Sequence, residues 1–308
     1  MSTVAEPAAL PRLALVTAVG AWETDEDAEP LVTALADVGI EAVAAVWDDA
    51  TVDWASFDLV VLRSPWDYTE RVDEFLAWAD RVEATTPLSN PGDVLRWNTD
   101  KHYLGELATA GLSVVPTAYL TAGDEDVSIE AVLPREGHFV VKPTVSSGSR
   151  NTARYTADQR AEATAHAARL LDEGRDVMVQ PYLDSVDEVG ETGMLFFDGR
   201  FSHAFRKGAL LTDGPANVEG LYAREQIAHR RPSEDELELA HDLLNWVAAR
   251  FGGEPPTYAR VDVLAGPAGR PMLLELELTE PSYFLSTDPD SPPRAARAYA
   301  TVLERRRR

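Results

Sequence analysis

The sequence predicts an α/β unit followed by α+β units. Short apolar runs alternate with helical patterns in the first 95 residues, and the later part of the chain also contains a hairpin and a pair of strands joined by a turn. Strands that alternate with helices imply a parallel sheet with crossover connections. A chain of 308 residues is long enough for two or three compact units. We expect a boundary after the first 95 residues, followed by one or two further units.

The first segment combines apolar runs with two helical patterns. Gly39 ends the first helix, and the Pro/Asn/Gly-rich stretch Thr86–Asp93 marks a boundary. The expected strands are Arg12–Val19, Glu41–Trp47 and Leu59–Leu62, and the expected helices are Asp25–Val38 and Thr69–Glu83.

The second segment begins with a helix that Asn98 caps and that runs to Ala110, before Gly111. It continues with the strands Phe139–Lys142, Thr152–Tyr155 and Val177–Gln180 and the helix Ala157–Leu171.

The third segment contains a hairpin and a capped helix. Asp198-Gly199 is a dipeptide typical of two-residue hairpin turns, here between Leu195–Phe197 and Arg200–Phe205. Ser233 and Glu236 form a capping box at the start of a helix that ends at Arg250. Two further strands, Thr257–Leu264 and Met272–Leu278, follow.

Composition excludes several classes of function. The formal net charge of −24 argues against a nucleic-acid backbone or an anionic membrane as partner. No apolar run approaches the roughly 20 residues that span a bilayer, and no secretory signal is recognisable, so we expect a cytoplasmic protein. The absence of cysteine excludes disulfides, thiolate zinc sites and a cysteine nucleophile. The histidines lack zinc-site spacing, and no G-x-S-x-G motif is present.

Carboxylates and one guanidinium alternate along the last two predicted strands. Arg260 and Asp262 share one face of the first strand, and Glu275 and Glu277 share one face of the second. Clustered carboxylates repel one another unless a cation lies among them, and Mg²⁺ prefers such oxygen ligands. The pattern therefore favours a metal site, and a solvated acidic sheet face is the alternative.

Lysine is rare in this chain. Of the 28 basic residues only Lys101, Lys142 and Lys207 are lysine, and a compact ammonium suits phosphate oxygens. Lys142 ends an apolar strand and precedes a small-residue loop with Ser146, Ser147 and Gly148, whose backbone N–H groups could close over phosphates. Chance retention of surface lysines and a plain polar hairpin are the alternatives.

Further candidates lie at the ends of predicted strands. Gln180–Leu183 forms a proline turn that could present backbone groups to an adenine edge. Arg63, with Trp66 nearby, follows a parallel strand where open α/β sheets usually bind ligands. We predict Arg63 as a clamp for a substrate carboxylate, with a helix-entry turn around a buried tryptophan as the alternative. Ser282 and Tyr283 are the other substrate candidates.

Taken in order, the two lysines, the Ser/Gly loop, the hinge, Arg260-x-Asp262 and Glu275-x-Glu277 resemble the ATP-grasp superfamily. The resemblance covers about Trp97 to Leu285. The hinge and last strand are similar to those of bacterial glutathione synthetase. The last strand is also similar to that of an actinobacterial group that includes a ureidoserine cyclo-ligase.

The resemblance implies an ATP-grasp fold, in which two α+β lobes sandwich ATP. Residues 1–95 would form a Rossmann-like α/β substrate domain, residues 96–184 the lobe with the phosphate loop, and residues 185–308 the lobe with the metal and catalytic residues. By position, Lys101 and Lys142 match the lysines that hold the α- and β-phosphates, and Ser146, Ser147 and Gly148 fall in the closing loop.

The resemblance also assigns roles at the other end of the nucleotide. Adenine contacts are implied for Gln180, Pro181, Tyr182 and Leu183, and ribose contacts for Asp184 or Glu188. Two Mg²⁺ ions, with Mn²⁺ as an alternative, are implied at Asp262, Glu275 and Glu277. Arg260 matches the cation that stabilises the transferring phosphoryl group, and Arg206 or Lys207 would add a basic contact.

The implied activity is ATP-dependent ligation. A small-molecule carboxylate would be activated as an acyl phosphate and attacked by an amine or other nitrogen nucleophile, with release of ADP and phosphate. The alternatives are an intramolecular cyclo-ligase of secondary metabolism and a non-catalytic nucleotide-binding module. A homodimer is a further expectation from the family.

Three features depart from the family pattern, and the first is a phosphate loop that is rich in serine instead of glycine. Glu277 stands where many relatives have asparagine, which adds negative charge beside the expected metals. The segment Leu210–Pro232, with Arg224, Arg230 and Arg231, matches no motif and is interpreted as either a substrate lid or a surface loop.

Overall fold

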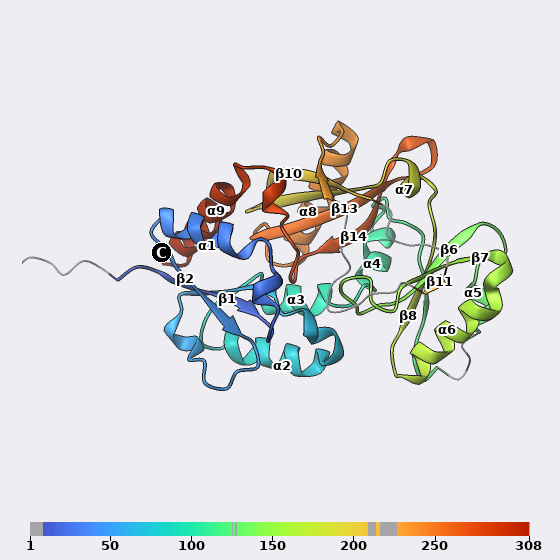
Figure 1. Cartoon of the computed structure of the whole chain (residues 1–308), viewed down its shortest axis with the longest axis horizontal. Coiled ribbons are helices and arrows are strands. Elements are labelled where there is room, and N and C mark those ends of the chain that lie inside the picture. The colour runs from blue at the N-terminus through green and yellow to red at the C-terminus, as the bar shows by residue number, and fades with distance from the viewer. Residues whose placement is uncertain (1–8, 125, 127, 209–213, 216–226, 308) are drawn as a thin grey trace, which may run out of the picture.

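The structure, a computed structural model, describes residues 9–124, 126, 128–208, 214–215 and 227–307. Most of the segment Leu210–Pro232, including Arg224, lies outside the described residues, so neither interpretation of it is tested. Three sheets and the helices packed on them form the described part of the chain (Figure 1).

The first sheet is parallel and forms the N-terminal unit. Its strand order is β2-β1-β3-β4, and the strands are β1 (Arg12–Thr17), β2 (Glu41–Val46), β3 (Leu59–Ser64) and β4 (Leu88–Ser89). The helices are α1 (Ala28–Asp37) and α2 (Val72–Glu83). Every residue of β3 is buried, which explains why this strand reads as a continuous apolar run before Arg63. β4 lies within the predicted boundary stretch, so that stretch still belongs to the sheet.

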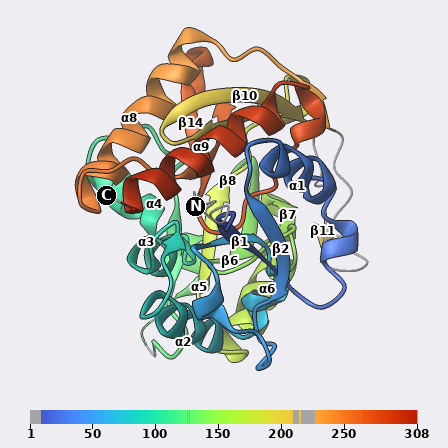
Figure 2. The ribbon, with the colours of Figure 1, turned by 90° about the vertical axis from the view of Figure 1, so that its left-hand side faces the viewer.

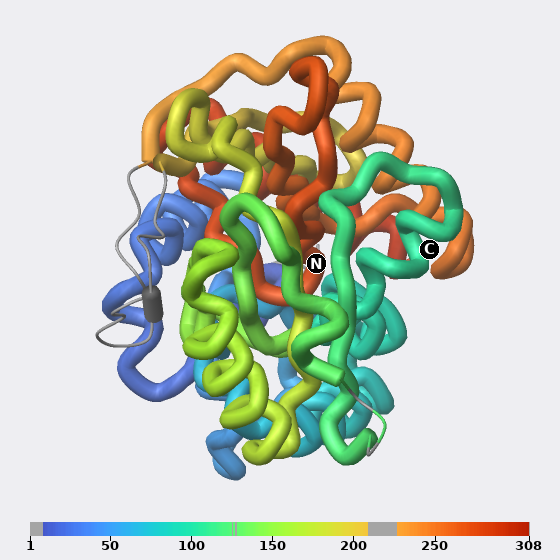
Figure 3. Tube along the Cα trace, turned by 90° about the vertical axis from the view of Figure 1, so that its right-hand side faces the viewer, coloured from blue at the N-terminus to red at the C-terminus, as the bar shows by residue number. Residues whose placement is uncertain are grey.

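The second sheet is antiparallel and is covered by α6 on one side. Its order is β11-β7-β6-β8-β5, and the strands are β5 (Ala118–Leu120), β6 (His138–Pro143), β7 (Ala153–Thr156), β8 (Val177–Pro181) and β11 (Gly214–Pro215). The helices are α5 (Ile129–Val132) and α6 (Arg160–Asp172). Figure 3 faces this unit, with α6 lying along the sheet. Small alanines at 163 and 167 let α6 approach the buried Phe139 and Val141 closely.

The third sheet lies between two long helices. Its order is β12-β10-β9-β13-β14, and the strands are β9 (Glu191–Phe197), β10 (Arg200–Lys207), β12 (Ile227–His229), β13 (Tyr258–Ala265) and β14 (Pro271–Glu277). One face packs on α8 (Glu234–Arg250), and the other on α9 (Ser291–Arg306) together with α1 (Figure 2). The short helix α7 (Ser185–Glu188) precedes β9.

Local sequence signals explain two features of this sheet. Asp198 and Gly199 both adopt positive φ angles, of 52° and 70°, as a type I′ hairpin turn requires. Ser233 and Glu236 make both hydrogen bonds of the capping box at the start of α8. The predicted hairpin and capping box are therefore confirmed.

The helix predicted from Asn98 to Ala110 is instead two helices. α3 (Gly92–Asn98) and α4 (Tyr103–Thr109) are separated by a turn that contains Lys101. The amide of Asn98 does not cap a helix, because it accepts from the N–H of Leu278 at 2.6 Å and donates to the carbonyl of Leu276 at 2.7 Å. These bonds satisfy the open edge of β14, which would otherwise leave backbone groups unpaired.

Short 3₁₀ helices complete the fold, at η1 (Trp22–Thr24), η2 (Trp54–Ser56), η3 (Trp66–Glu70), η4 (Ala157–Gln159), η5 (Pro267–Gly269) and η6 (Leu285–Thr287). None of the helices in the described ranges combines the length and apolar character needed to cross a bilayer.

Candidate active site

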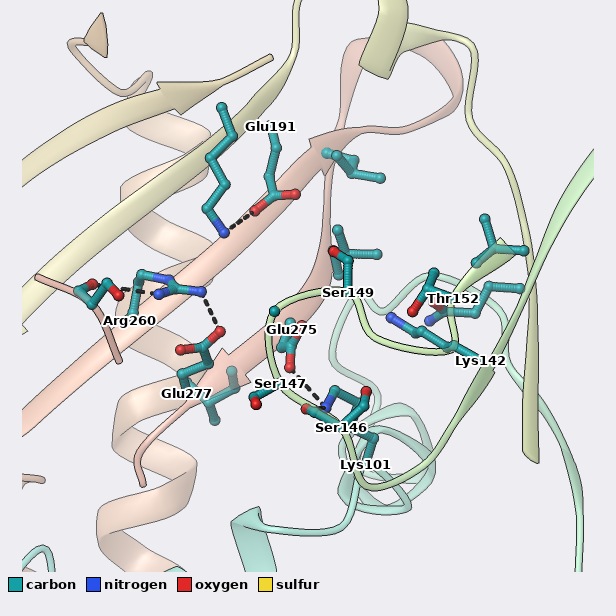
Figure 4. Close-up of a pocket in the computed structure, with 18 of the residues that line it drawn as sticks. Lys101, Lys142, Ser146, Ser147, Ser149, Thr152, Glu191, Arg260, Glu275 and Glu277 are labelled. Atoms are coloured by element: carbon teal, nitrogen blue, oxygen red, sulfur yellow. Dashed lines mark hydrogen bonds and ion pairs between the residues drawn. The ribbon is translucent and has the colours of Figure 1, made fainter. Parts of the chain in front are cut away.

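A single cavity collects residues from all three units. Its walls come from the turn after α3, the loop after β6, the end of β8, the facing ends of β9 and β10, and β13 with β14 (Figure 4). The N-terminal unit contributes η3. Of the sequence-predicted residues, the cavity is lined by Trp66, Lys101, Lys142, Ser146, Ser147, Gly148, Gln180, Pro181, Tyr182, Leu183, Lys207, Arg260, Glu275, Glu277 and Ser282.

The three lysines of the chain all face this cavity. Lys101 Nζ lies 2.9 Å from the carbonyl oxygen of Ser146 and 3.0 Å from Glu275 Oε1. Lys207 Nζ lies 3.0 Å from both Glu191 Oε1 and Asp262 Oδ2. Lys142 differs, because no carboxylate of the described residues lies within 4.0 Å of its ammonium. Burial lowers the pKa of Lys142. The cavity therefore holds a desolvated cation suited to an anionic ligand.

Arg260 connects the carboxylates of β13 and β14. In the antiparallel register Arg260 lies opposite Glu277 and Asp262 lies opposite Glu275, as alternation along the two strands predicts. The guanidinium of Arg260 donates to Asp262 at 2.9–3.0 Å and also to Glu277. Burial raises the pKa of Asp262, but Arg260 and Lys207 lower it more, to about 2.

Glu277 is less well compensated than its neighbours. Burial raises its pKa to about 8, Arg260 opposes this, and the charges of Glu275 and Asp262 add to it. The ion pair with Arg260 argues for a charged Glu277, but Asp262 takes most of that guanidinium's hydrogen bonds. We infer that the cluster lacks enough positive charge to keep all three carboxylates ionised.

This imbalance predicts a pH dependence of stability. A folded-state pKa above the ordinary carboxyl range means that folded protein retains a proton that unfolded protein releases, so this group's contribution to stability falls as pH rises from about 4.5 to about 8. We expect the melting temperature without divalent ions to fall more steeply across this window in wild type than in Glu277→Gln. Calorimetry of both proteins would measure this difference, and parallel curves would contradict it.

The same residues fit a divalent cation. Their donors are the hard carboxylate oxygens that Mg²⁺ prefers, and the raised pKa of Glu277 indicates a place where added positive charge would be favourable. Among the described residues no set of three or more His, Cys, Asp or Glu side chains already converges on one point. Asp262 itself lies behind the cavity wall, 1% exposed, with Arg260 and Lys207 in front of it.

The loop after β6 is bound to the N-terminal unit. The Ser147 hydroxyl donates to the carbonyl of Trp66 at 3.3 Å, and Arg150 donates to the same carbonyl and to Glu70 Oε1 at 2.8 Å. Gly148 and Ser149 both have φ near 59°, which lets the loop turn tightly above the cavity. Consequently η3 and the loop cover the cavity together.

The hinge after β8 presents backbone and aromatic surface. Gln180 is 3% exposed, and its side chain donates to Thr117 Oγ1 at 2.9 Å, so this bond orients its amide. The ring of Tyr182 stacks under the guanidinium of Arg154 at 4.0 Å, and its hydroxyl donates to Asp187 at 2.7 Å. The hinge therefore offers a fixed, flat wall.

Three predicted nucleotide contacts lie outside the cavity. Arg206 directs its Nε to the carbonyl of Val189, and a bulge in β10 between Phe201 and His203 turns Lys207 toward the cavity in its place. Asp184 has a side chain that is 81% exposed, and Glu188 is also exposed. At this end the cavity is instead lined by Glu191, opposite Lys207 in the β9–β10 pair.

Arg63 is a structural residue, which corrects its prediction as a substrate clamp. It is fully buried, donates to the carbonyl of Pro281 at 2.9 Å and pairs with Asp25 and Asp27 at 3.4 Å. Its guanidinium lies 3.7 Å from the ring centroid of Tyr283, which is itself fully buried. Neither Arg63 nor Tyr283 lines the cavity.

Replacing Arg63 by methionine is expected to destabilise the protein strongly. The change leaves two neighbouring carboxylates buried without a cation, which costs about 3–5 kcal/mol and lowers the melting temperature by on the order of 10 °C. Thermal unfolding of Arg63→Met beside the exposed control Arg81→Met measures the difference. Equal melting temperatures would show that the buried pair contributes nothing.

Several lining residues carried no sequence signal. Tyr68, Asn98, Glu191 and Glu280 reach the cavity from four different segments. A pair such as Tyr68 and Glu280 depends on the packing of the N-terminal unit against the strand end after β14, which no local pattern encodes.

Comparison with known proteins agrees with this architecture. Residues 13–90 match a family model described as the N-terminal domain of the D-cycloserine synthetase DcsG. The chain is 42% identical over 298 residues to the cycloserine biosynthesis protein DcsG of Streptomyces lavendulae, covering 95% of this chain and 99% of that protein.

Solved structures extend the likeness. The crystal structure of D-cycloserine synthetase DcsG matches with a TM-score of 0.88 at 41% identity, covering 95% of this chain and 99% of that one. The D-alanine–D-alanine ligase of Bacillus anthracis in complex with ATP matches with a TM-score of 0.65 at 14% identity, over 96% and 98% of the two chains. The ATP-grasp ligase PsnB with Mg and ADP matches with a TM-score of 0.63 at 18% identity, over 96% and 99%.

The two distant likenesses establish the fold, and the near-full-length relative establishes the family. The expected mixed α/β architecture is confirmed, and so is the resemblance on which the expected activity depended. The chain belongs to the DcsG family of ATP-grasp ligases, enzymes that use ATP to form carbon–nitrogen bonds.

Proposed function

We propose that this enzyme is an intramolecular ligase that closes a ring in a ureidoserine-type amino acid. The substrate carboxylate attacks the γ-phosphorus of ATP and ADP leaves. A nitrogen of the same molecule then attacks the acyl carbon, phosphate leaves with one former carboxylate oxygen, and the nitrogen loses a proton. The 42% identity to DcsG over 95% of the chain supports ring closure as the form of ligation.

The observation that carries the nucleotide assignment is Lys142. Its ammonium is desolvated, faces the cavity and has no carboxylate within 4.0 Å among the described residues. A phosphate group would supply the missing charge. Lys101 would bind the adjacent phosphate. Its ammonium donates to the carbonyl of Ser146 and therefore lies beside the covering loop. Ser146, Ser147 and Gly148 would then close over the triphosphate.

The hinge would hold the nucleoside. Pro181, Tyr182 and Leu183 line the cavity, where their backbone groups can meet an adenine edge. The Glu191 carboxylate lines the cavity and is held by Lys207 at 3.0 Å, whereas Asp184 and Glu188 lie outside the cavity, so Glu191 is the better acceptor for ribose hydroxyls.

Two Mg²⁺ ions would be held by Glu275 and Glu277, with Asp262 behind them. The cavity wall already carries as many acidic as basic side chains, so a bound triphosphate adds uncompensated negative charge. Bound Mg²⁺ would neutralise charge on the phosphates during transfer. Use of Mn²⁺ and a homodimeric state stay predictions from the family resemblance.

Arg260 would stabilise the transferring phosphoryl group. Asp262 and Glu277 hold its guanidinium in place, and its Nη1 donates to the carbonyl of Ser282 at 3.4 Å. Because an acyl phosphate hydrolyses readily, water has to be excluded until the nitrogen attacks. The contacts of Ser147 and Arg150 with η3 provide such a cover.

Product analysis tests the proposal. The enzyme would be incubated with Mg-ATP and ureidoserine, with and without hydroxylamine, and nucleotides and organic products identified by mass spectrometry. We expect ADP and a ring-closed product without any second amine, and a hydroxamate when hydroxylamine is added. ADP formation that requires a separate amine would replace ring closure by two-substrate ligation.

A further inference from the structure

Glu280 lines the cavity near Lys101, Glu275 and Arg260. It follows β14 by three residues and lines the wall with Trp66, Tyr68 and Ser282. This position is next to Arg260, which donates to the carbonyl of Ser282 at 3.4 Å. A group bound by Glu280 would therefore belong to the molecule that receives the phosphoryl group, and not to the nucleoside.

Tyr68 lies beside Glu280 in the cavity wall. Tyr68 is 3% exposed, and its ring stacks on Phe75 with centroids 4.7 Å apart. Its hydroxyl lies beside Glu280 and lowers the pKa of that carboxyl group. Burial raises the pKa of Tyr68 well above the ordinary phenol value, so the hydroxyl remains a donor. The Glu280 carboxylate therefore has a buried, well-packed donor beside it.

The backbone around Glu280 is also held. The carbonyl of Pro281 accepts from Arg63 at 2.9 Å, and the N–H of Tyr283 donates to Asp27 at 2.6 Å. The buried pair of Arg63 with Asp27 thus anchors the segment that carries Glu280. This gives the otherwise structural Arg63 an indirect part in shaping the site.

Glu280 differs in charge environment from the other cavity acids. Glu191, Glu275 and Glu277 each pair with a lysine or arginine. Within the described ranges, no basic side chain lies within 4.0 Å of Glu280, and Lys101 and Arg260 act on it only at longer range. Burial raises the pKa of Glu280 to about 7. No cation in the described part of the chain therefore pairs with this carboxylate.

We propose that Glu280, positioned by Tyr68, is the counter-ion for the α-ammonium group of the substrate. The inference rests on the proposed function and deepens it, because it restricts the substrates to amino acids with a free primary amine. A carboxylate here would repel the triphosphate and attract a compact cation with several N–H donors. Binding that ammonium leaves the substrate carboxylate free to face Arg260.

Glu280→Gln tests this role when two substrates are compared. The first is ureidoserine, and the second is the same molecule with hydrogen in place of the α-amino group. Wild type is expected to prefer the amino substrate, and Glu280→Gln to lower kcat/KM for it by about 10- to 100-fold, mainly through KM, since hydrogen bonds to charged groups are among the stronger ones. Turnover of the desamino substrate should change by less than about threefold, so the preference collapses.

Matched variants separate this role from a structural or metal-binding one. Tyr68→Phe should shift the same preference in the same direction but less, and exposed Glu304→Gln should shift nothing. The dependence on Mg²⁺ concentration should be unchanged in Glu280→Gln. Equal losses with both substrates, or an altered Mg²⁺ requirement, would overturn the inference.

A binding measurement keeps the inference testable if turnover is absent. Calorimetric titration of the Mg-ADP complex with D-cycloserine, which carries a primary amine, should give a dissociation constant about 10-fold weaker in Glu280→Gln. An equal constant in the two proteins, or no binding to wild type, contradicts the ammonium subsite. ADP formation by wild type with ureidoserine is read separately, so failure of the proposed function is distinguished from failure of this inference.

Discussion

Lys142→Met is expected to lower kcat/KM for ATP by about 100- to 1000-fold, the usual cost of removing one preorganised charge from a transition-state site. The ammonium is the cavity cation that has no carboxylate within 4.0 Å in the described ranges. Its electrostatic interaction is therefore available to the nucleotide. A coupled assay for ADP release at varied ATP measures the loss, and titration with ADP measures how much of it is binding.

The same variant should not be less stable than wild type. Methionine keeps the length of the side chain and removes a desolvated charge that no close carboxylate compensates. Melting temperatures without nucleotide are thus expected to be equal or higher in Lys142→Met. A variant that is both inactive and strongly destabilised would instead indicate a structural lysine.

Asp262→Asn is expected to lower turnover about 1000-fold while ATP still binds. A loss of this size corresponds to roughly 4 kcal/mol of transition-state stabilisation. Asp262 holds Arg260 through hydrogen bonds of 2.9–3.0 Å and Lys207 at 3.0 Å. Asparagine cannot balance these two cations, so both would be misplaced. Its role as a proposed Mg²⁺ ligand would be weakened at the same time.

Comparison with an exposed residue isolates this effect. Asp242→Asn on α8 removes the same charge at the surface and should retain full activity. Fluorescence titration with ATP checks that Asp262→Asn is folded and binds nucleotide. Turnover within about tenfold of wild type would contradict the role given to Asp262 and favour a non-catalytic use of the nucleotide site.

The sequence was sufficient where a simple periodicity decides the geometry. Alternation along two strands placed Arg260 and Asp262 opposite Glu277 and Glu275, and the antiparallel register agrees with it. The Asp198-Gly199 turn likewise defined the β9–β10 hairpin. These signals are local, so they predict the strand register without knowledge of the tertiary packing.

The sequence was insufficient where a β-bulge or a distant contact determines the position of a side chain. Counting back from the hairpin turn places Arg206 opposite Glu191, but the bulge between Phe201 and His203 shifts the register and places Lys207 there. The sequence around Asn98 is typical of a helix cap. Its actual hydrogen-bond partner, Leu278 after the open edge of β14, is 180 residues away in the sequence and leaves no local signal.

Residues around the proposed substrate subsite were the hardest to predict. Arg63 ends an apolar strand and looks exposed to ligand, but Asp25 and Asp27 at the start of α1 bury it in an ion pair. Glu280 and Tyr68 meet only because η3 packs against the segment after β14. Such pairs depend on how separate units pack, which no spacing rule describes.

Isotope transfer from the substrate carboxylate tests the central claim most directly. Ureidoserine labelled with ¹⁸O in its carboxylate would be converted with Mg-ATP, and the phosphate and nucleotide products analysed by mass spectrometry. Activation as an acyl phosphate predicts one ¹⁸O atom in inorganic phosphate, unlabelled ADP and no AMP. Label in AMP with release of pyrophosphate, or unlabelled phosphate, would contradict the account.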